Sequence, residues 1–163
     1  MNKTILAMGT IEDDNVKVNE EIKIIYEKSK YSKYIVTPCV VCTVDVFNSL
    51  IDRIKYDYIH IAGHGLNEML NFVNSNISAQ KFGSLMSKSK TCPELLVLNC
   101  CFSTSFIDNI NRNIYFTGIS YPLKLYGIAS FSFSDSFYNS LLLMGNDIIT
   151  SFNNSHNYKY ILH

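Results

Sequence analysis

The sequence lacks a net charge, a long hydrophobic run and a proline-rich linker. Its 163 residues carry 14 basic and 14 acidic side chains, so no overall field attracts nucleic acid or an anionic membrane. No apolar run reaches the roughly 20 residues of a membrane-spanning helix, and the run after Met1 is too short for a signal peptide. We therefore expect a cytoplasmic protein with no direct nucleic-acid or membrane partner.

Internal repeats are also missing, and the one low-complexity stretch is polar, at residues 151–157. Hydrophobic residues make up 47% of the chain and aromatic residues 13%. That is enough for one well-filled core and too little for two ordinary domains. The sequence thus predicts a single domain over residues 1–163.

The five cysteines are an odd number, and Cys100 adjoins Cys101, which argues against a disulfide framework. Cys39 and Cys42 have the spacing of a redox or zinc motif, yet no second such pair or matching pair of histidines follows. Because they lie in a valine-rich run, we interpret them mainly as strand residues, with metal binding as the second interpretation. The main prediction is that the chain uses no metal and no cofactor.

Five short apolar runs predict the strands. Each run is nearly continuous rather than alternating, which is typical of strands covered on both faces in a parallel sheet. The runs lie at residues 5–8, 34–41, 58–62, 95–98 and 114–116.

Helical patterns lie between most of these runs, and one follows the last. Ser78 is the expected N-cap of the third helix and Gly145 the expected C-cap of the last. Because strand and helix alternate, the sequence predicts a three-layer α/β/α sandwich around a mostly parallel sheet. The hydrophobic stripes are Val18, Ile22, Ile25 and Tyr26; Phe47, Leu50, Ile51 and Ile54; Phe82, Leu85 and Met86; and Phe133, Phe137, Leu141 and Met144.

His64 and Cys101 follow the third and fourth predicted strands, and functional groups gather at the carboxyl ends of strands in such a sheet. Two glycines flank His64, and glycine lets backbone N–H groups come close to a substrate. A nucleophilic thiol must lose its proton, for which a neighbouring imidazole is the usual base. Each residue alone is more typical of a turn histidine or a core thiol, but their joint placement predicts a catalytic dyad.

Two neighbouring residues compete for these roles. Alternation within the third strand directs His60 into the sheet layers, so we interpret it as structural. Cys100 continues the fourth strand and is expected to point into a helix-packed face. Periodicity therefore favours Cys101 over Cys100 but leaves the choice open.

The motifs "YIHIAGHG" and "ELLVLNCCFST" together resemble the caspase-like (clan CD) cysteine peptidases, and among them the CHAT domains. The segments "ILAMGTIEDDNVKVNEEIKII" and "FSDSFYNSLLLMGNDI" look like the opening and the late helix of the short bacterial CHAT type. The resemblance covers nearly the whole chain and implies a caspase-like fold. Matched position by position, it assigns the catalytic histidine to His64 and the nucleophile to Cys101 rather than Cys100.

The resemblance implies an endopeptidase that cleaves a protein or peptide through a thioester. Cys101 would attack the carbonyl, His64 would help generate the thiolate and protonate the leaving amine, and the N–H groups of Gly65 and Cys101 would hold the oxyanion. The resemblance to small CHAT proteins further implies that this protein is a regulated effector in a bacterial defence or stress system. Residues 104–113 are too few for the excised linker of caspases, so we expect activation by a partner protein or self-association.

Acidic residues could form a pocket for a basic substrate side chain. Glu12, Asp13 and Asp14 follow the first strand, and a shielded carboxylate pairs well with lysine or arginine. We favour the alternative that Asp13 or Asp14 caps the first helix. Asp135, expected at the start of the late helix, is either a second pocket residue or a solvated one.

Two other functions fit parts of the pattern. A catalytically idle caspase-like module would use the same fold for protein interaction. A flavodoxin-like nucleotide binder would share the strand–helix alternation, but the acidic loop after the first strand would repel phosphate. The presence of both dyad residues favours the enzyme.

Overall fold

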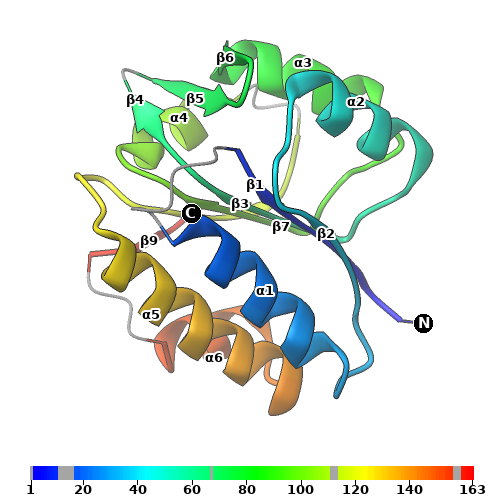
Figure 1. Ribbon diagram of the computed structural model, residues 1–163, viewed down its shortest axis with the longest axis vertical. Helices are drawn as coiled ribbons and strands as arrows, with labels where there is room; N and C mark the ends of the chain where they lie inside the picture. The colour runs from blue at the N-terminus through cyan, green and yellow to red at the C-terminus, as the bar shows by residue number, and fades with distance from the viewer. Residues whose placement is uncertain (1, 11–16, 67, 111–113, 156–158) are drawn as a thin grey trace.

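A six-stranded, mostly parallel sheet forms the centre of the molecule in the computed structural model (Figure 1). The structure describes residues 2–10, 17–66, 68–110, 114–155 and 159–163. The strands lie in the order β2, β1, β3, β7, β8, β9; the first five are parallel and β9 is antiparallel to β8. Their bounds are β1 (Thr4–Gly9), β2 (Ile35–Cys39), β3 (Tyr58–Ala62), β7 (Leu95–Asn99), β8 (Thr117–Ser120) and β9 (Ile161–Leu162).

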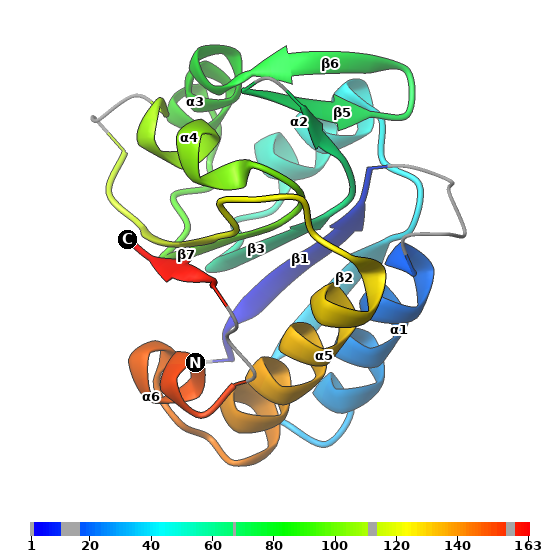
Figure 2. The ribbon, with the colours of Figure 1, turned by 90° about the vertical axis from the view of Figure 1, so that its left-hand side faces the viewer.

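Helices cover both faces of this sheet (Figures 1 and 2). One face carries α1 (Val18–Ser29), α5 (Gly127–Tyr138) and α6 (Ile148–Asn153), and the other carries α2 (Val44–Arg53), α3 (Ala79–Lys88) and α4 (Ser103–Asp108). Alternate strand residues enter the two cores, as Ile5 and Leu6 of β1 do. The predicted mixed α/β architecture is confirmed. Within the described ranges, no helix combines the length and apolar character needed to cross a membrane.

The predicted strands agree with the structure except for the fifth. Residues 58–62 form β3 as expected, and β1, β2 and β7 end within two residues of their predicted bounds. The prediction of a strand at residues 114–116 is wrong, because β8 begins at Thr117. Ile114 and Phe116 instead pack from a loop against the core beneath α3 and α4. Their hydrophobicity reflects this packing and not a strand.

A small antiparallel sheet, absent from the sequence prediction, begins immediately after His64. It consists of β4 (Gly65–Leu66), β5 (Met69–Phe72) and β6 (Ser75–Ser78). These strands are short and partly polar, so they carry too little periodicity to be recognised. The predicted cap of α3 is confirmed, since the Ser78 hydroxyl accepts a hydrogen bond from the N–H of Lys81 at 3.2 Å.

The late helix begins earlier than its hydrophobic stripe suggests. α5 starts at Gly127 and continues into a π-helical turn, η2 (Asn139–Leu143), and Gly145 follows with φ 71°. That left-handed conformation favours glycine and supports the predicted end of the helix. The placement of Asp135 at the start of this helix is wrong, because it lies eight residues after Gly127.

Candidate active site

His64 lies in the turn that joins β3 to β4 and is half-buried. The preceding Gly63 is buried against Thr10, and a side chain at Gly63 would overlap the Thr10 hydroxyl. The N–H of Thr10 in turn donates to the carbonyl of Ala62 at 3.0 Å. The first glycine of the motif therefore leaves room for the Thr10 side chain, and the chain after β1 packs closely on the histidine turn.

Cys100 and Cys101 diverge at the end of β7. Cys100 is buried in the core beneath α3 and α4, as alternation predicted, and burial raises the pKa of its thiol to about 12. It therefore keeps its proton at neutral pH. Cys101 is half-buried and packs at the margin of the opposite core. Of these two cysteines, Cys101 is the one that is partly exposed.

The turn that carries Cys101 has a strained backbone and is held by backbone hydrogen bonds. Phe102, the next residue, has φ 53°, a left-handed conformation that is uncommon for a bulky side chain. Its N–H donates to the carbonyl of Leu123 at 3.0 Å, and the N–H of Ser103 donates to the carbonyl of Tyr121 at 2.9 Å. Strained backbone persists only where its surroundings impose it, and it is concentrated at functional sites.

The histidine turn and the cysteine turn are in contact. β3 and β7 are neighbours, with Ala62 beside Asn99. A side chain at Gly65 would overlap the carbonyl oxygen of Cys101, so only glycine allows this approach. Gly65 and Cys101 also line one small hollow. The structure thus places the two turns of the predicted dyad side by side.

The two predicted oxyanion donors are not used by the sheet. The N–H of Asn71 donates to the carbonyl of His64 at 3.1 Å, which makes Gly65 and Leu70 the non-hydrogen-bonded pair of that ladder. The N–H of Gly65 therefore points away from β5. Among the described residues, no acceptor takes the N–H of Cys101. Both groups meet the first requirement for binding an oxyanion.

The Cys101 sulfur is held by a loop that sequence reasoning did not connect with it. The N–H of Leu125 donates to the sulfur at 3.2 Å, and the Leu125 carbonyl oxygen accepts from the thiol at 3.7 Å. Leu125 lies between β8 and α5. These two contacts fix the position of the sulfur against this loop.

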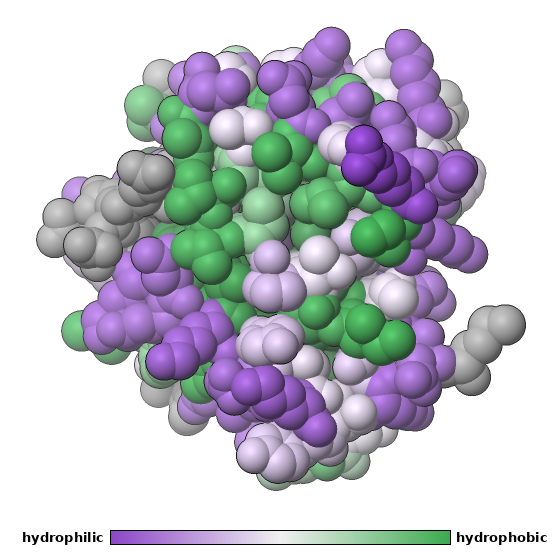
Figure 3. All heavy atoms as spheres, turned by 45° about the vertical axis from the view of Figure 1, so that its right-hand side comes forward, coloured by the Kyte–Doolittle hydropathy of each residue, from purple (hydrophilic) through white to green (hydrophobic). Residues whose placement is uncertain are grey.

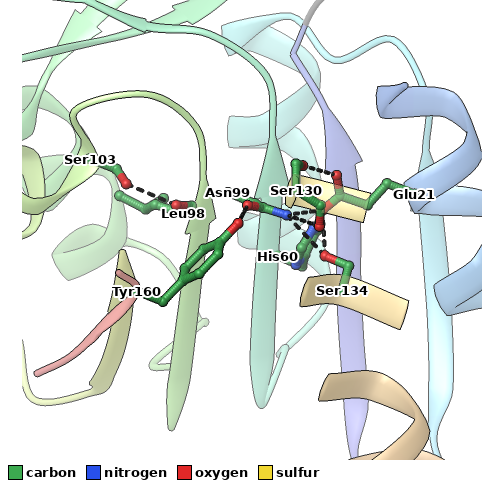
Figure 4. A network of polar contacts seen from close by, with 8 residues as sticks. All are labelled: Glu21, His60, Leu98, Asn99, Ser103, Ser130, Ser134 and Tyr160. Atoms are coloured by element: carbon green, nitrogen blue, oxygen red, sulfur yellow. Dashed lines mark hydrogen bonds and ion pairs between the residues drawn. The ribbon is translucent and has the colours of Figure 1, made fainter. Parts of the chain in front are cut away.

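A buried carboxylate on α1 anchors the residues behind the site (Figure 4). Glu21 is fully buried, where a carboxylate is costly unless it is paired and hydrogen-bonded. Because a carboxylate only accepts, His60 donates to it through Nε2. Its full burial agrees with the prediction that His60 points into the sheet layers. The donors are His60 Nε2 at 2.7 Å, Ser134 Oγ at 2.6 Å, Ser130 Oγ at 2.7 Å and Asn99 Nδ2.

Asn99 connects this network to the cysteine turn. Its amide nitrogen binds Glu21, and its oxygen accepts from the hydroxyl of Tyr160. Burial raises the pKa of Tyr160, so its phenol remains a donor, and its ring stacks on Phe133 at 3.9 Å between centroids. The last residue of β7 is therefore held on two sides immediately before the cysteines.

The predicted pocket residues are not brought to the dyad by the described structure. Glu12, Asp13 and Asp14 lie outside the described residues. Asp135 is half-exposed and forms an ion pair with Lys28 of α1 at 3.0 Å. At 1.5 Å per residue it lies about 12 Å along α5 from the end nearest Leu125. Its partner is thus another helix, away from the cysteine turn.

A serine, a histidine and an aspartate also contact one another in series near β8. Ser120 Oγ lies 2.7 Å from Nε2 of His163, and Nδ1 of His163 lies 3.3 Å from the carboxylate of Asp108. The order resembles a hydrolase triad, but Ser120 is fully buried. No substrate reaches its hydroxyl, so these contacts tie the chain end to β8.

Two larger hollows lie at the opposite edge of the sheet. They have volumes of about 580 and 530 Å³, and both include Glu94 and Thr117, at the amino ends of β7 and β8. Sites in parallel α/β sheets form at the carboxyl ends instead. Within the described part of the chain, no three histidine, cysteine or acidic side chains group closely enough to hold a metal ion.

The sequence matches no known family model, and no curated protein matches it. Support for a function comes from the residues themselves.

Replacing Glu21 with alanine should cost about 3–5 kcal/mol in the free energy of unfolding, because three buried donors lose their acceptor and the Asn99 amide loses one of its three. Urea denaturation followed by circular dichroism measures this change. Glu20→Ala is the matched control: Glu20 is the preceding residue, is exposed, and should have little effect. Similar midpoints for the two variants would contradict the role assigned to Glu21.

Gly65→Ala should destabilise the protein by about 1–3 kcal/mol, because the added methyl group overlaps the backbone of Cys101. It should also change the alkylation rate of Cys101, since the turn must shift. Leu66→Ala, at the next and exposed position, serves as the control for both measurements. If Gly65→Ala behaves like Leu66→Ala, the two turns are not in the contact described.

Proposed function

We propose that the chain is a caspase-like cysteine endopeptidase that cleaves a protein or peptide with a His64–Cys101 dyad. The observation that carries this proposal is the contact between the two turns, where Gly65 packs on the backbone of Cys101. The strained backbone at Phe102 and the buried, protonated state of Cys100 support it further. The caspase-like form of the fold is part of the same proposal.

In the proposed reaction the Cys101 thiolate attacks the scissile carbonyl and forms a tetrahedral intermediate. The N–H groups of Gly65 and Cys101 stabilise its oxyanion, since neither is used by the sheet. His64 donates a proton to the leaving amine, and a thioester remains on the sulfur. Water then attacks the thioester and releases the second product with the free thiol.

The proposed peptidase is a regulated effector of a bacterial defence or stress system. The Cys101 sulfur is bound on one side by the backbone of Leu125. The segment from residue 121 to 126 must therefore shift before a carbonyl can approach the sulfur from that side. A partner protein or a second copy that moves this segment would switch the enzyme on.

One observation favours the second candidate, a catalytically idle interaction module. The hollow beside Cys101 is small and has no room for a substrate side chain. An idle module would keep the dyad in place without ever opening a pocket. The reactivity of the thiol distinguishes this module from the peptidase.

Cys101 should react with iodoacetamide in a manner that depends on His64. A free cysteine is only a few per cent thiolate at pH 7, so losing the base should slow alkylation of Cys101 on the order of tenfold. Mapping the labelled peptides of wild type, His64→Ala and Cys101→Ala by mass spectrometry measures each thiol separately. Exposed Cys92 provides the internal reference rate.

Equal and slow labelling of Cys101 and Cys92, unchanged by His64→Ala, would rule out an activated dyad and favour the idle module. Labelling that depends on His64 would justify a search for cleaved peptides. In that search, Cys101→Ser is the variant expected to lose activity.

A further inference from the structure

The segment from Cys39 to Cys42 is the chemically distinctive feature that the proposed peptidase does not use. β2 ends at Cys39, the chain bends at two exposed valines, and Thr43 caps α2 directly after Cys42. Figure 3 shows hydrophobic residues gathered on this side of the molecule, over β2 and α2. Cys39 is half-buried on this bend, whereas Cys42 is fully buried.

At this bend each thiol donates to a nearby backbone carbonyl, Cys42 to Thr43 at 3.5 Å and Cys39 to Val41 at 3.9 Å. Interaction with the Cys42 side chain lowers the pKa of Cys39 to about 7. The same interaction, together with burial, raises the pKa of Cys42. The titratable groups that face Cys39 are Cys42 and Tyr56, and burial raises the pKa of Tyr56, so that phenol stays neutral.

The lowered pKa of Cys39 and its interaction with buried Cys42 would not be expected of two ordinary strand residues three positions apart. A half-buried thiol with a lowered pKa, three residues before a buried thiol, has the Cys-x-x-Cys spacing and the unequal burial of a redox pair. A structural zinc site would need four ligands, and the described residues bring no third one to this pair. We propose that Cys39 and Cys42 form a redox-active dithiol that closes to an intramolecular disulfide by exchange with a small-molecule disulfide.

The exchange takes place in two steps. The Cys39 thiolate attacks one sulfur of the small disulfide, forms a mixed disulfide and releases one thiolate. The Cys42 thiol then gives up its proton, attacks the Cys39 sulfur and releases the second thiolate. The two cysteines are oxidised and the small disulfide is reduced to two thiols, so no other oxidant is needed.

The dithiol lies at the same edge of the sheet as the predicted dyad. The N–H of Cys42 donates to the carbonyl of Gly9 at 2.8 Å, and a side chain at Gly9 would lie 2.5 Å from the carbonyl oxygen of Val40. Gly9 pairs with Ala62, two residues before His64. The bend that carries the dithiol is therefore in contact with the end of β1, beside the candidate site. The proposal does not depend on peptidase activity.

The test is equilibration of the full chain with oxidised and reduced glutathione, followed by acid quenching, alkylation and peptide mapping. In the wild type, the thiols of Cys39 and Cys42 should become resistant to alkylation together, and the mass of the protein segment that carries them should fall by two hydrogens. Cys92 should remain alkylatable. The initial rate at Cys39 should rise as the pH passes through about 7. Glutathione accumulating on Cys39 in the wild type, or a rate no faster than that of Cys92, would overturn the proposal.

Three variants assign the roles. Cys42→Ser should trap one glutathione on Cys39, because the resolving thiol is gone, and Cys42→Ala provides the same test without a buried hydroxyl. Cys39→Ser should leave Cys42 unmodified, because a buried thiol does not meet glutathione. Thermal unfolding confirms that each variant is folded. Reaction of Cys42 in folded Cys39→Ser would contradict the assignment of Cys39 as the attacking thiol.

Discussion

Burial of the Glu21 carboxylate is the constraint around which the carboxyl end of the sheet is organised. Removing a carboxylate from water costs several kcal/mol, and only well-placed partners offset that cost. Glu21 lies on α1, and its donors come from β3, β7 and α5. The charge is therefore satisfied only when all four elements occupy their native positions. Hydrophobic burial alone would tolerate helices that slide along the sheet, whereas this network specifies one arrangement.

The network reaches the predicted dyad through one residue. Asn99 ends β7 between Glu21 and Tyr160, and the cysteine turn begins directly after it. On its other side, that turn donates backbone hydrogen bonds to the carbonyls of Tyr121 and Leu123, in the segment after β8. The cysteine turn is therefore fixed both by the sheet and by the loop that precedes α5. Support of this kind gives a group on a loop the precision of a group on a strand.

Hydrophobic periodicity predicted most of the residues that line the buried faces, but it wrongly included Tyr26, Ile54 and Met144, which are exposed. Alternation correctly buried His60, and neither pattern revealed the carboxylate that binds it. A signal was present, because Glu21 lies three residues after Val18 and four before Ile25, on the buried face of α1. An acidic residue in a first turn is usually explained by the helix dipole, so its position alone does not identify it as a buried acceptor. The strand at Thr117–Ser120 had no comparable signal, since it is short and weakly hydrophobic.

Spacing in the sequence shows where cysteines lie, whereas burial decides what each can do. Cys100 and Cys101 are adjacent, and alternation buries one and leaves the other reachable. Cys39 and Cys42 are three apart, and a bend produces the same division. The contact between Cys101 and the backbone of the following loop could not be predicted, because its partner lies 24 residues away. Cysteine reactivity in this chain is therefore a property of the tertiary structure, and the sequence alone identifies only the candidates.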